Sequence, residues 1–163
     1  MNEKYLILGV GNTLLSDEGF GIRALGYLAT HYKWPQNATL TDGGTGGLLL
    51  MADLMGCDRA AVLDICKIGS EPGTIYSFSA DAMETAKSFP QSAHSTNIND
   101  ILSSCELAGQ KPETHIFALE PFDYQTVSSH LSKEAQKLLP VFCEKVVQEL
   151  RKMWSMEITK ITS

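Results

Sequence analysis

The sequence predicts an α/β protein in which a largely parallel sheet carries helices on both faces. Short apolar runs recur along the chain, and runs without polar alternation are typical of strands that are buried on both sides. Amphipathic segments separate these runs, and the connections between them are short. No repeat, linker or low-complexity segment interrupts the 163 residues, so we expect a single domain, residues 1–163.

The first half of the chain contains three predicted strands and two predicted helices. Residues 5–10 form an apolar run that ends at Gly11, which indicates a buried strand. Ser16 and two acidic residues then precede apolar residues at helical spacing, so a helix is expected to begin there and to fade at residues 31–35. Residues 38–41 are a second strand, 42–47 a glycine-rich loop, 48–55 a second helix and 59–65 a third strand.

The second half continues the alternation. A Pro72-Gly73 turn precedes an alternating strand at residues 74–78, and residues 81–87 are a short helix. Residues 97–108 are helical, residues 114–119 are the last buried strand, and residues 132–153 are a long amphipathic helix. Pro140 is expected to kink or divide that last helix, because proline removes a helical hydrogen bond. The tail, residues 155–163, carries little pattern and is expected to be loose.

The charge and cysteine content exclude several classes of partner. The net charge is −6, and an acidic chain lacks the basic surface that nucleic-acid phosphates require. No stretch reaches the roughly 20 apolar residues of a membrane-spanning helix, and the N-terminal apolar run is too short for a signal peptide. The four cysteines form no C-x-x-C pair, so we expect free thiols in a reducing cytoplasm. No nucleic-acid or membrane partner is expected, and the protein is expected to be a monomer.

Four chemically reactive side chains follow the predicted strands or lie in loops near them. Glu18 follows the first strand, Asp42 ends the second, Asp64 ends the third, and His94 lies in a loop before a helix. Ligands of open α/β sheets collect at the carboxyl ends of the strands, so we expect Glu18, Asp64 and His94 to converge there. Two carboxylates and an imidazole suit zinc, nickel, manganese or iron, and three protein ligands leave coordination positions open.

Each of these residues also has an ordinary structural interpretation, and the sequence leaves both open. Glu18 complements a helix dipole, and Asp64 caps a turn at a strand end. Asp42 accepts hydrogen bonds from the following glycine amides, and His94 is a solvated loop histidine. The other three histidines, His31, His115 and His130, have no partner pattern and are assigned structural or surface positions.

Familiar enzyme signatures are absent from the chain. Gly9 and Gly11 begin a dinucleotide-like pattern, but Leu14 occupies the position of the third glycine, and Asp17 and Glu18 would repel a pyrophosphate. The loop at residues 42–47 has no lysine and is not a phosphate-binding loop. The sequence contains neither H-E-x-x-H nor G-x-S-x-G. On these grounds the residues indicate only an α/β domain with a candidate carboxylate–histidine metal site.

Four motifs, taken in order, add a family resemblance. Residues 8–23 contain LGVGN, LLSDEG and GIR, and residues 42–47 read DGGTGG. VLD follows at residues 62–64, and AH at 93–94 precedes DIL at 100–102. In order and spacing, from about residue 4 to residue 150, the chain resembles the hydrogenase maturation endopeptidases. The resemblance implies a three-layer α/β/α sandwich with a twisted, mostly parallel five-stranded sheet.

The resemblance also implies an activity and site residues. Family members remove a short C-terminal peptide from the precursor of a nickel–iron hydrogenase large subunit once nickel is in place. The family's metal-binding positions fall on Glu18, Asp64 and His94, and Asp42 matches an acidic position needed for cleavage or recognition. The catalytic set implied is therefore Asp42, Asp64 and Glu18. Nickel is presented by the precursor, and other divalent cations are expected to substitute in vitro.

Some features of the chain depart from the family pattern and leave alternatives open. Residues 95–99 (STNIN) are more polar than usual, and Ala93 stands where a proline is common, so the partner hydrogenase is not defined. A non-catalytic metal-binding or precursor-binding chaperone on the same fold is the main alternative to a protease. A nucleotide-binding enzyme is a third hypothesis.

Overall fold

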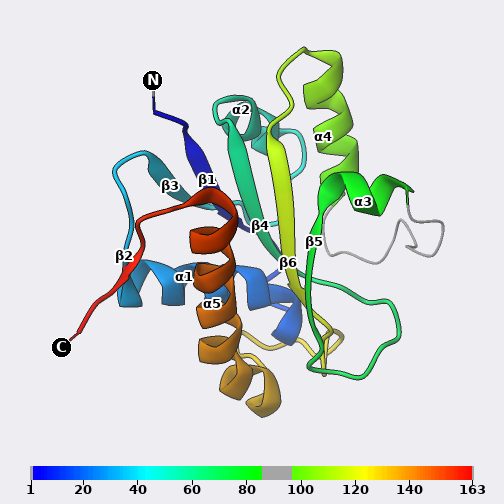
Figure 1. Cartoon of the computed structure of the whole chain (residues 1–163). Helices are drawn as coiled ribbons and strands as arrows, with labels where there is room; N and C mark the ends of the chain where they lie inside the picture. Colours follow the sequence, from blue (N-terminus) through cyan, green and yellow to red (C-terminus); the bar gives the residue numbers. More distant parts are fainter. Residues whose placement is uncertain (1, 86–96, 163) are drawn as a thin grey trace.

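The computed structural model describes residues 2–85 and 97–162, and the alternation of strands and helices follows the sequence closely (Figure 1). In chain order the elements are β1 (Tyr5–Gly9), the 3-10 helix η1 (Ser16–Gly19), α1 (Phe20–His31), β2 (Tyr32–Lys33), β3 (Ala38–Asp42), α2 (Leu49–Met55), β4 (Arg59–Ile65), β5 (Ile75–Ser79), α3 (Ala80–Thr85), α4 (Ile98–Leu107), β6 (Glu113–Leu119), α5 (Lys133–Trp154) and β7 (Thr159–Lys160).

The main sheet has five strands in the order β3-β1-β4-β6-β5. Strand β1 is parallel to both β3 and β4, and β4 is parallel to β6. Only β5, at one edge of this sheet, runs antiparallel to its neighbour. The prediction of a mostly parallel five-stranded sheet is confirmed, and β1 and β4 are buried because sheet neighbours and helices cover them.

Helices cover both faces of this sheet, as a three-layer sandwich requires (Figure 1). Helices α1 and α5 pack on one face, and α2, α3 and α4 pack on the other. Strand pleating sends alternate residues to the two layers: Ile7 belongs to the cluster under α1 and α5, whereas Leu6 and Leu8 belong to the cluster under α2 and α4. Each face of β1 therefore contributes to a separate hydrophobic core.

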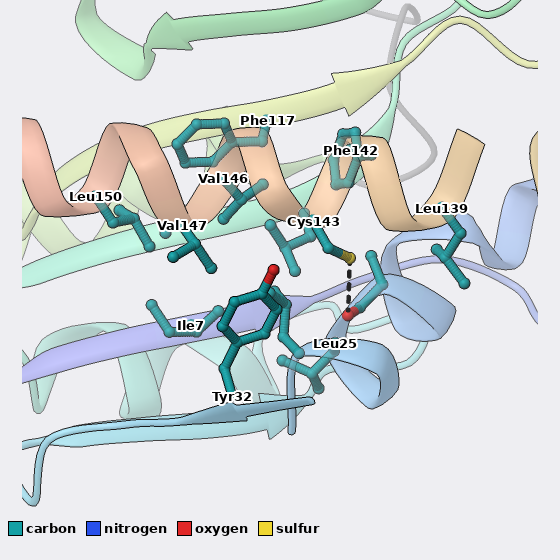
Figure 2. Packing of buried hydrophobic residues seen from close by; sticks show 14 of the residues in the cluster. Ile7, Leu25, Tyr32, Phe117, Leu139, Phe142, Cys143, Val146, Val147 and Leu150 are labelled. Atoms are coloured by element: carbon teal, nitrogen blue, oxygen red, sulfur yellow. Dashed lines mark hydrogen bonds between the residues drawn. The ribbon is translucent and has the colours of Figure 1, made fainter. Parts of the chain in front are cut away.

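The core beneath α1 and α5 is filled by aromatic and branched side chains (Figure 2). Phe20 of α1 meets Phe142 of α5 edge to face, with ring centroids 4.9 Å apart. Cys143 lies in the same layer and points its thiol at the Ala24 carbonyl oxygen, 3.6 Å away (Figure 2). These contacts hold α1, and with it the turn that precedes α1, against the sheet.

The cysteines are free thiols, as predicted. Cys66, Cys105 and Cys143 are buried, and Cys57 is partly buried. Burial raises the pKa of Cys57, Cys66 and Cys143 to about 12. At neutral pH these thiols are therefore protonated and act as small apolar side chains.

Helix α5 continues through Pro140. The sequence predicted that Pro140 would either kink or divide this helix, and the prediction of a division is wrong. Pro140 and Gln136, whose carbonyl would otherwise accept the missing hydrogen bond, are both exposed, and water can hydrate that carbonyl. The helix begins at a serine cap, because Ser132 Oγ accepts a hydrogen bond from Ala135 N at 3.2 Å.

The C-terminal tail is anchored, so the prediction of a loose tail is wrong. Strand β7 pairs antiparallel with β2, and Met156 and Ile158 are buried in the core beneath α5. Arg151 donates two hydrogen bonds to the Ile158 carbonyl oxygen, from Nε at 2.9 Å and from an Nη at 2.5 Å. Two-residue strands carry no periodicity, which is why the sequence pattern did not reveal this pairing.

Among the described residues, no helix is both long enough and apolar enough to span a bilayer.

Candidate active site

The strand order reverses at β1, and this reversal marks the place where the topology favours ligand binding. The chain leaves β1 towards α1 on one face of the sheet, whereas it leaves β3 towards α2 on the other face (Figure 1). Loops that diverge in this way leave a gap above the carboxyl ends of the strands, and ligands of open α/β sheets bind there.

Backbone hydrogen bonds tie the loop after β1 to the glycine-rich loop after β3. In the sheet register Gly9 lies opposite Asp42. Gly43 N donates to Gly9 O at 2.8 Å, and Gly11 N donates to Gly44 O at 2.8 Å. Asp42 is therefore fixed at the rim by its pairing with Gly9 and by the backbone contacts of the two residues that follow it.

The same loop is tied to the end of β4 and to η1. Val10 N donates to Leu63 O at 3.0 Å, one residue before Asp64. Asn12 N donates to Glu18 O at 3.1 Å. Residues 9–12 thus form a backbone hub, which we call the glycine hub, and it brings the chain at residues 18, 42 and 64 to a single rim of the sheet.

Two glycines make this convergence possible, because a side chain at either position would collide with backbone. A Cβ on Gly21 would lie 2.1 Å from Leu63 O and 2.5 Å from Val10 O. Gly11 has a φ of 142°, and a Cβ there would lie 1.9 Å from Glu18 O. The glycines of the N-terminal motif therefore allow η1 and α1 to approach the strand ends.

Glu18 is largely buried at this rim and is paired with a lysine. Its side chain is 12% exposed, and Lys67 Nζ lies 2.9 Å from its Oε1. The same ammonium lies 4.8 Å from the centroid of the Tyr124 ring. A carboxylate that already holds a cation at short range is chemically suited to hold a metal cation.

Asp64 and Asp42 differ in their surroundings. Asp64 is fully buried, and its Oδ1 accepts a hydrogen bond from Ile65 N at 2.8 Å. Asp64 shares the pleat of Val62, on the sheet face covered by α2 and α4. Asp42 is exposed, and its Oδ1 accepts from Gly44 N at 2.9 Å, which confirms the predicted Asx turn.

His94 lies outside the described residues. Helix α4, which begins four residues later at Ile98, packs on the same sheet face that Asp64 joins. Within residues 2–85 and 97–162, no three His, Cys, Asp or Glu side chains are arranged to hold a metal ion. The ligand set of Glu18, Asp64 and His94 therefore stays a prediction, with the two carboxylates contributed by adjoining elements of one rim.

Asp17 has a structural role that the sequence analysis missed. This fully buried carboxylate accepts hydrogen bonds from Phe122 N and Asp123 N at 3.0 Å each, and from Ser132 N and Ser132 Oγ at 2.8 Å each. It joins η1 to the loop after β6 and to the first turn of α5. Asp17 and Glu18 are adjacent and equally charged, so no sequence signal separates the buried anchor from the residue at the rim.

A second buried carboxylate, Glu120, was also missed. Its oxygens accept hydrogen bonds from Gly69 N at 3.0 Å, Ile68 N at 3.2 Å and the Tyr76 hydroxyl at 3.0 Å. Burial raises the pKa of Tyr76, and the Glu120 carboxylate acts in the same direction. Glu120 fixes the loop after β4 that carries Lys67.

Comparisons with known proteins show the family and support the fold. Residues 22–149 match the family model described as hydrogenase maturation protease. The chain is 32% identical, over 96% of its length and 78% of the relative, to a hydrogenase expression/formation protein of Rhizobium leguminosarum. It is 32% identical over 68% of each chain to the hydrogenase 2 maturation protease of Escherichia coli. The solved hydrogenase-maturating endopeptidase HybD of Escherichia coli superposes with a TM-score of 0.83, at 26% identity, over 96% of this chain and 97% of the other.

The fold and these comparisons together define an α/β peptidase built on a mostly parallel five-stranded sheet. The chain belongs to the hydrogenase maturation protease family. It is accordingly an endopeptidase of hydrogenase maturation.

Proposed function

We propose that the protein removes a C-terminal extension from the precursor of a nickel–iron hydrogenase large subunit, after nickel has been inserted. The proposal is supported chiefly by one observation: the glycine hub brings the chain at Glu18 and at Asp64 to one rim of the sheet. Both residues match metal-binding positions in the family motif. We place the reaction in the cytoplasm and assign it to a monomer.

Glu18, Asp64 and His94 are the proposed recognition set for the nickel that the precursor carries. Carboxylate and imidazole donors suit nickel, and a precursor that lacks the ion would leave Glu18 and Asp64 without this contact. A divalent ion bound at this rim would also offset the repulsion between the carboxylates that coordinate it. Other divalent cations of similar size should bind the same donors in vitro.

The proposed catalytic set is Asp42, Asp64 and Glu18. Asp42 is exposed and is oriented by the Gly44 amide, so its remaining oxygen is available to a peptide or to water. Either Asp42 or the buried Asp64 is the candidate general base for the water that attacks the scissile bond. A bound divalent ion would lower the pKa of that water.

The test uses purified protein and two forms of the precursor, one loaded with nickel and one nickel-free. We expect the nickel-loaded precursor alone to lose the mass of its C-terminal extension, as measured by intact-protein mass spectrometry. Binding of the loaded precursor without any shortening would instead support the chaperone hypothesis. Equal shortening of both forms would contradict nickel recognition.

A further inference from the structure

Lys67 is the cation that contacts the proposed metal-recognition carboxylate. Its Nζ lies 2.9 Å from Glu18 Oε1 and 4.8 Å from the centroid of the Tyr124 ring. The Glu18 side chain is 12% exposed and the Lys67 side chain is 28% exposed. The pair joins residues 49 apart in sequence and is largely shielded from solvent, unlike the exposed pairs that contribute little to stability.

The fold fixes the position of Lys67 from both sides. The preceding residue, Cys66, donates a backbone hydrogen bond to Leu119 O at 2.9 Å. The two following amides, of Ile68 and Gly69, donate to the buried Glu120 carboxylate. The lysine backbone is therefore held in place at the end of β4, three residues after Asp64, and only the side chain is free to move.

We propose that Lys67 is an intramolecular counter-ion that occupies the cation position at Glu18 until the metal centre of the precursor displaces it. This inference rests on the proposed function, in which Glu18 contacts that metal. Lys67 is a positioning residue: its ammonium, 2.9 Å from Oε1, keeps the Glu18 carboxylate aimed at the rim when no metal is present. A precursor without nickel then meets a carboxylate that is already satisfied.

Displacement requires a cation with more charge than the ammonium, and it requires another contact for the ammonium once it has left Glu18. A divalent ion interacts with a carboxylate about twice as strongly as a monovalent ammonium at the same distance. The Tyr124 ring supplies this other contact, because the ring face attracts a cation and already lies within cation–π range of Nζ. The ammonium therefore stays at the rim after it leaves Glu18.

The test measures binding of Ni²⁺ alone to the full-length protein at one fixed pH, by calorimetry and by the metal-induced change in Tm. In Lys67→Met the ion no longer competes with the ammonium, so we expect Ni²⁺ affinity to rise on the order of tenfold, as for removal of one nearby like charge. Lys67→Arg keeps the charge and should bind Ni²⁺ as the unmodified protein does. Lys145→Met is the matched control, because Lys145 pairs with Glu149 at 4.0 Å on α5, and it should leave affinity unchanged.

A variant of opposite sign guards against a folding artefact in Lys67→Met. In Tyr124→Leu the ammonium loses its ring contact in both states. The loss is greater after displacement, when Glu18 no longer pairs with Lys67, so Ni²⁺ affinity should fall by about two- to fivefold. The Tyr124 side chain is 38% exposed, so this substitution leaves the core intact. A merely structural lysine would change Tm in the absence of metal but would not shift Ni²⁺ affinity in either direction.

The outcomes separate this inference from the proposed function. Suppose that Glu18→Gln abolishes Ni²⁺ binding, but that Lys67→Met binds Ni²⁺ no more tightly than the unmodified protein does. That result overturns the counter-ion role and leaves the proposed function standing. Ni²⁺ binding that Glu18→Gln does not reduce overturns the assignment of Glu18 to the metal, and the counter-ion role falls with it.

Discussion

At the scale of single residues, two adjacent acids have separate tasks. Asp17 is fully buried and accepts four hydrogen bonds, so it is committed to holding η1 against the loop after β6. Glu18 lies at the rim and contacts the Lys67 ammonium. The 3-10 turn directs the two side chains apart, and it depends on Ser16, whose φ of 51° is unusual for a residue other than glycine.

The first prediction concerns the two carboxylates of the proposed metal site. Glu18→Gln and Asp64→Asn each keep the side-chain shape but remove the negative charge that a divalent ion requires. We expect both variants to fold, with far-UV circular dichroism spectra like that of the unmodified protein, and to lose trimming of the nickel-loaded precursor. Mass spectrometry of the precursor measures the loss.

Asp53→Asn provides the control for a generic loss of negative charge, because Asp53 lies exposed on α2. It should trim the precursor at the unmodified rate. Continued trimming by both Glu18→Gln and Asp64→Asn would remove the metal-recognition argument.

The second prediction is a pH dependence that arises from His115. Its ring is mostly buried beside α5, Ser77 Oγ lies 2.8 Å from Nε2, and the Ser77 hydroxyl also donates to Glu149. Burial lowers the pKa of His115 below 6.5, although Glu149 and Glu113 act in the opposite direction. The His115 ring therefore binds a proton more tightly in the unfolded chain than in the folded protein. The contribution of the neutral ring to the free energy of unfolding is complete above about pH 6.5, and it is lost as the pH falls through the pKa of His115 in the folded protein.

Urea unfolding at pH 7.5 and pH 5.5 measures this effect. The decrease in the free energy of unfolding between the two pH values should be smaller in His115→Gln than in the unmodified protein. An equal decrease in both proteins would show that other groups cause the acid sensitivity.

At the scale of elements, the packing of α1 against the strand ends requires a residue without a side chain at position 21. The third prediction compares two glycines of this helix. Gly21→Ala places a Cβ 2.1 Å from Leu63 O, and because backbone cannot move as a flexible side chain can, we expect a loss of at least about 2 kcal/mol in the free energy of unfolding. Gly26→Ala meets nothing within 4 Å and should stabilise the helix by about 0.5–1 kcal/mol.

Chemical denaturation measures both changes. Gly21→Ala should also slow trimming, since a displaced α1 carries Glu18 with it, whereas Gly26→Ala should trim normally. A similar stability change in the two variants would contradict the close packing of α1 on the strand ends.

The fourth prediction tests the anchored tail. Ile158 is 2% exposed and packs into the core, whereas Ile161, three residues later, is 49% exposed. Ile158→Ala should cost about 2–5 kcal/mol by leaving a cavity. Ile161→Ala should change stability by less than about 0.5 kcal/mol. If urea midpoints showed equal effects, the tail would not be part of the folded core in solution.

The accuracy of the sequence predictions differed between kinds of element. The five long strands were predicted to within about a residue. Strands β1, β4 and β6 are continuous apolar runs, which is typical of burial on both faces, whereas β5 was recognised from its alternation after the Pro72-Gly73 turn. The β2–β7 pair was missed, because its residues meet only through contacts distant in sequence. The first helix was expected from Ser16, but residues 16–19 form a 3-10 turn and α1 begins at Phe20.

At the scale of the whole molecule, one sheet is shared by two cores. Residues of β1, β4 and β6 alternate between the layer under α1 and α5 and the layer under α2 and α4. Neither layer can lose its packing without exposing the shared strands. The fifth prediction is therefore a single cooperative unfolding transition for residues 1–163, with coincident midpoints by far-UV circular dichroism and tryptophan fluorescence. Separated midpoints would indicate two independent units.

The topology predicts where the proposed site lies, but it did not predict the contacts that the structure shows around Glu18. Strand ends and neighbouring loops put forward Glu18, Asp64 and His94 as a converging set, and the family motif matched the same three residues and added a role for Asp42. Lys67 was not predicted, because a lone lysine after a strand has no motif. Its partnership with Glu18 depends on the loop geometry that the buried Glu120 imposes.

The glycine hub has a consequence for attempts to change which precursor the enzyme accepts. Backbone hydrogen bonds hold the hub, and a Cβ at Gly9, Gly11 or Gly21 would collide with neighbouring atoms. Substitutions therefore cannot adjust this region in small steps, and a mutant library should leave residues 9, 11 and 21 unchanged. Leu14, Leu48 and Leu49 flank these segments and are 64%, 73% and 87% exposed, so variation there costs the scaffold little. A screen for new substrate preference would therefore gain most by randomising these three leucines.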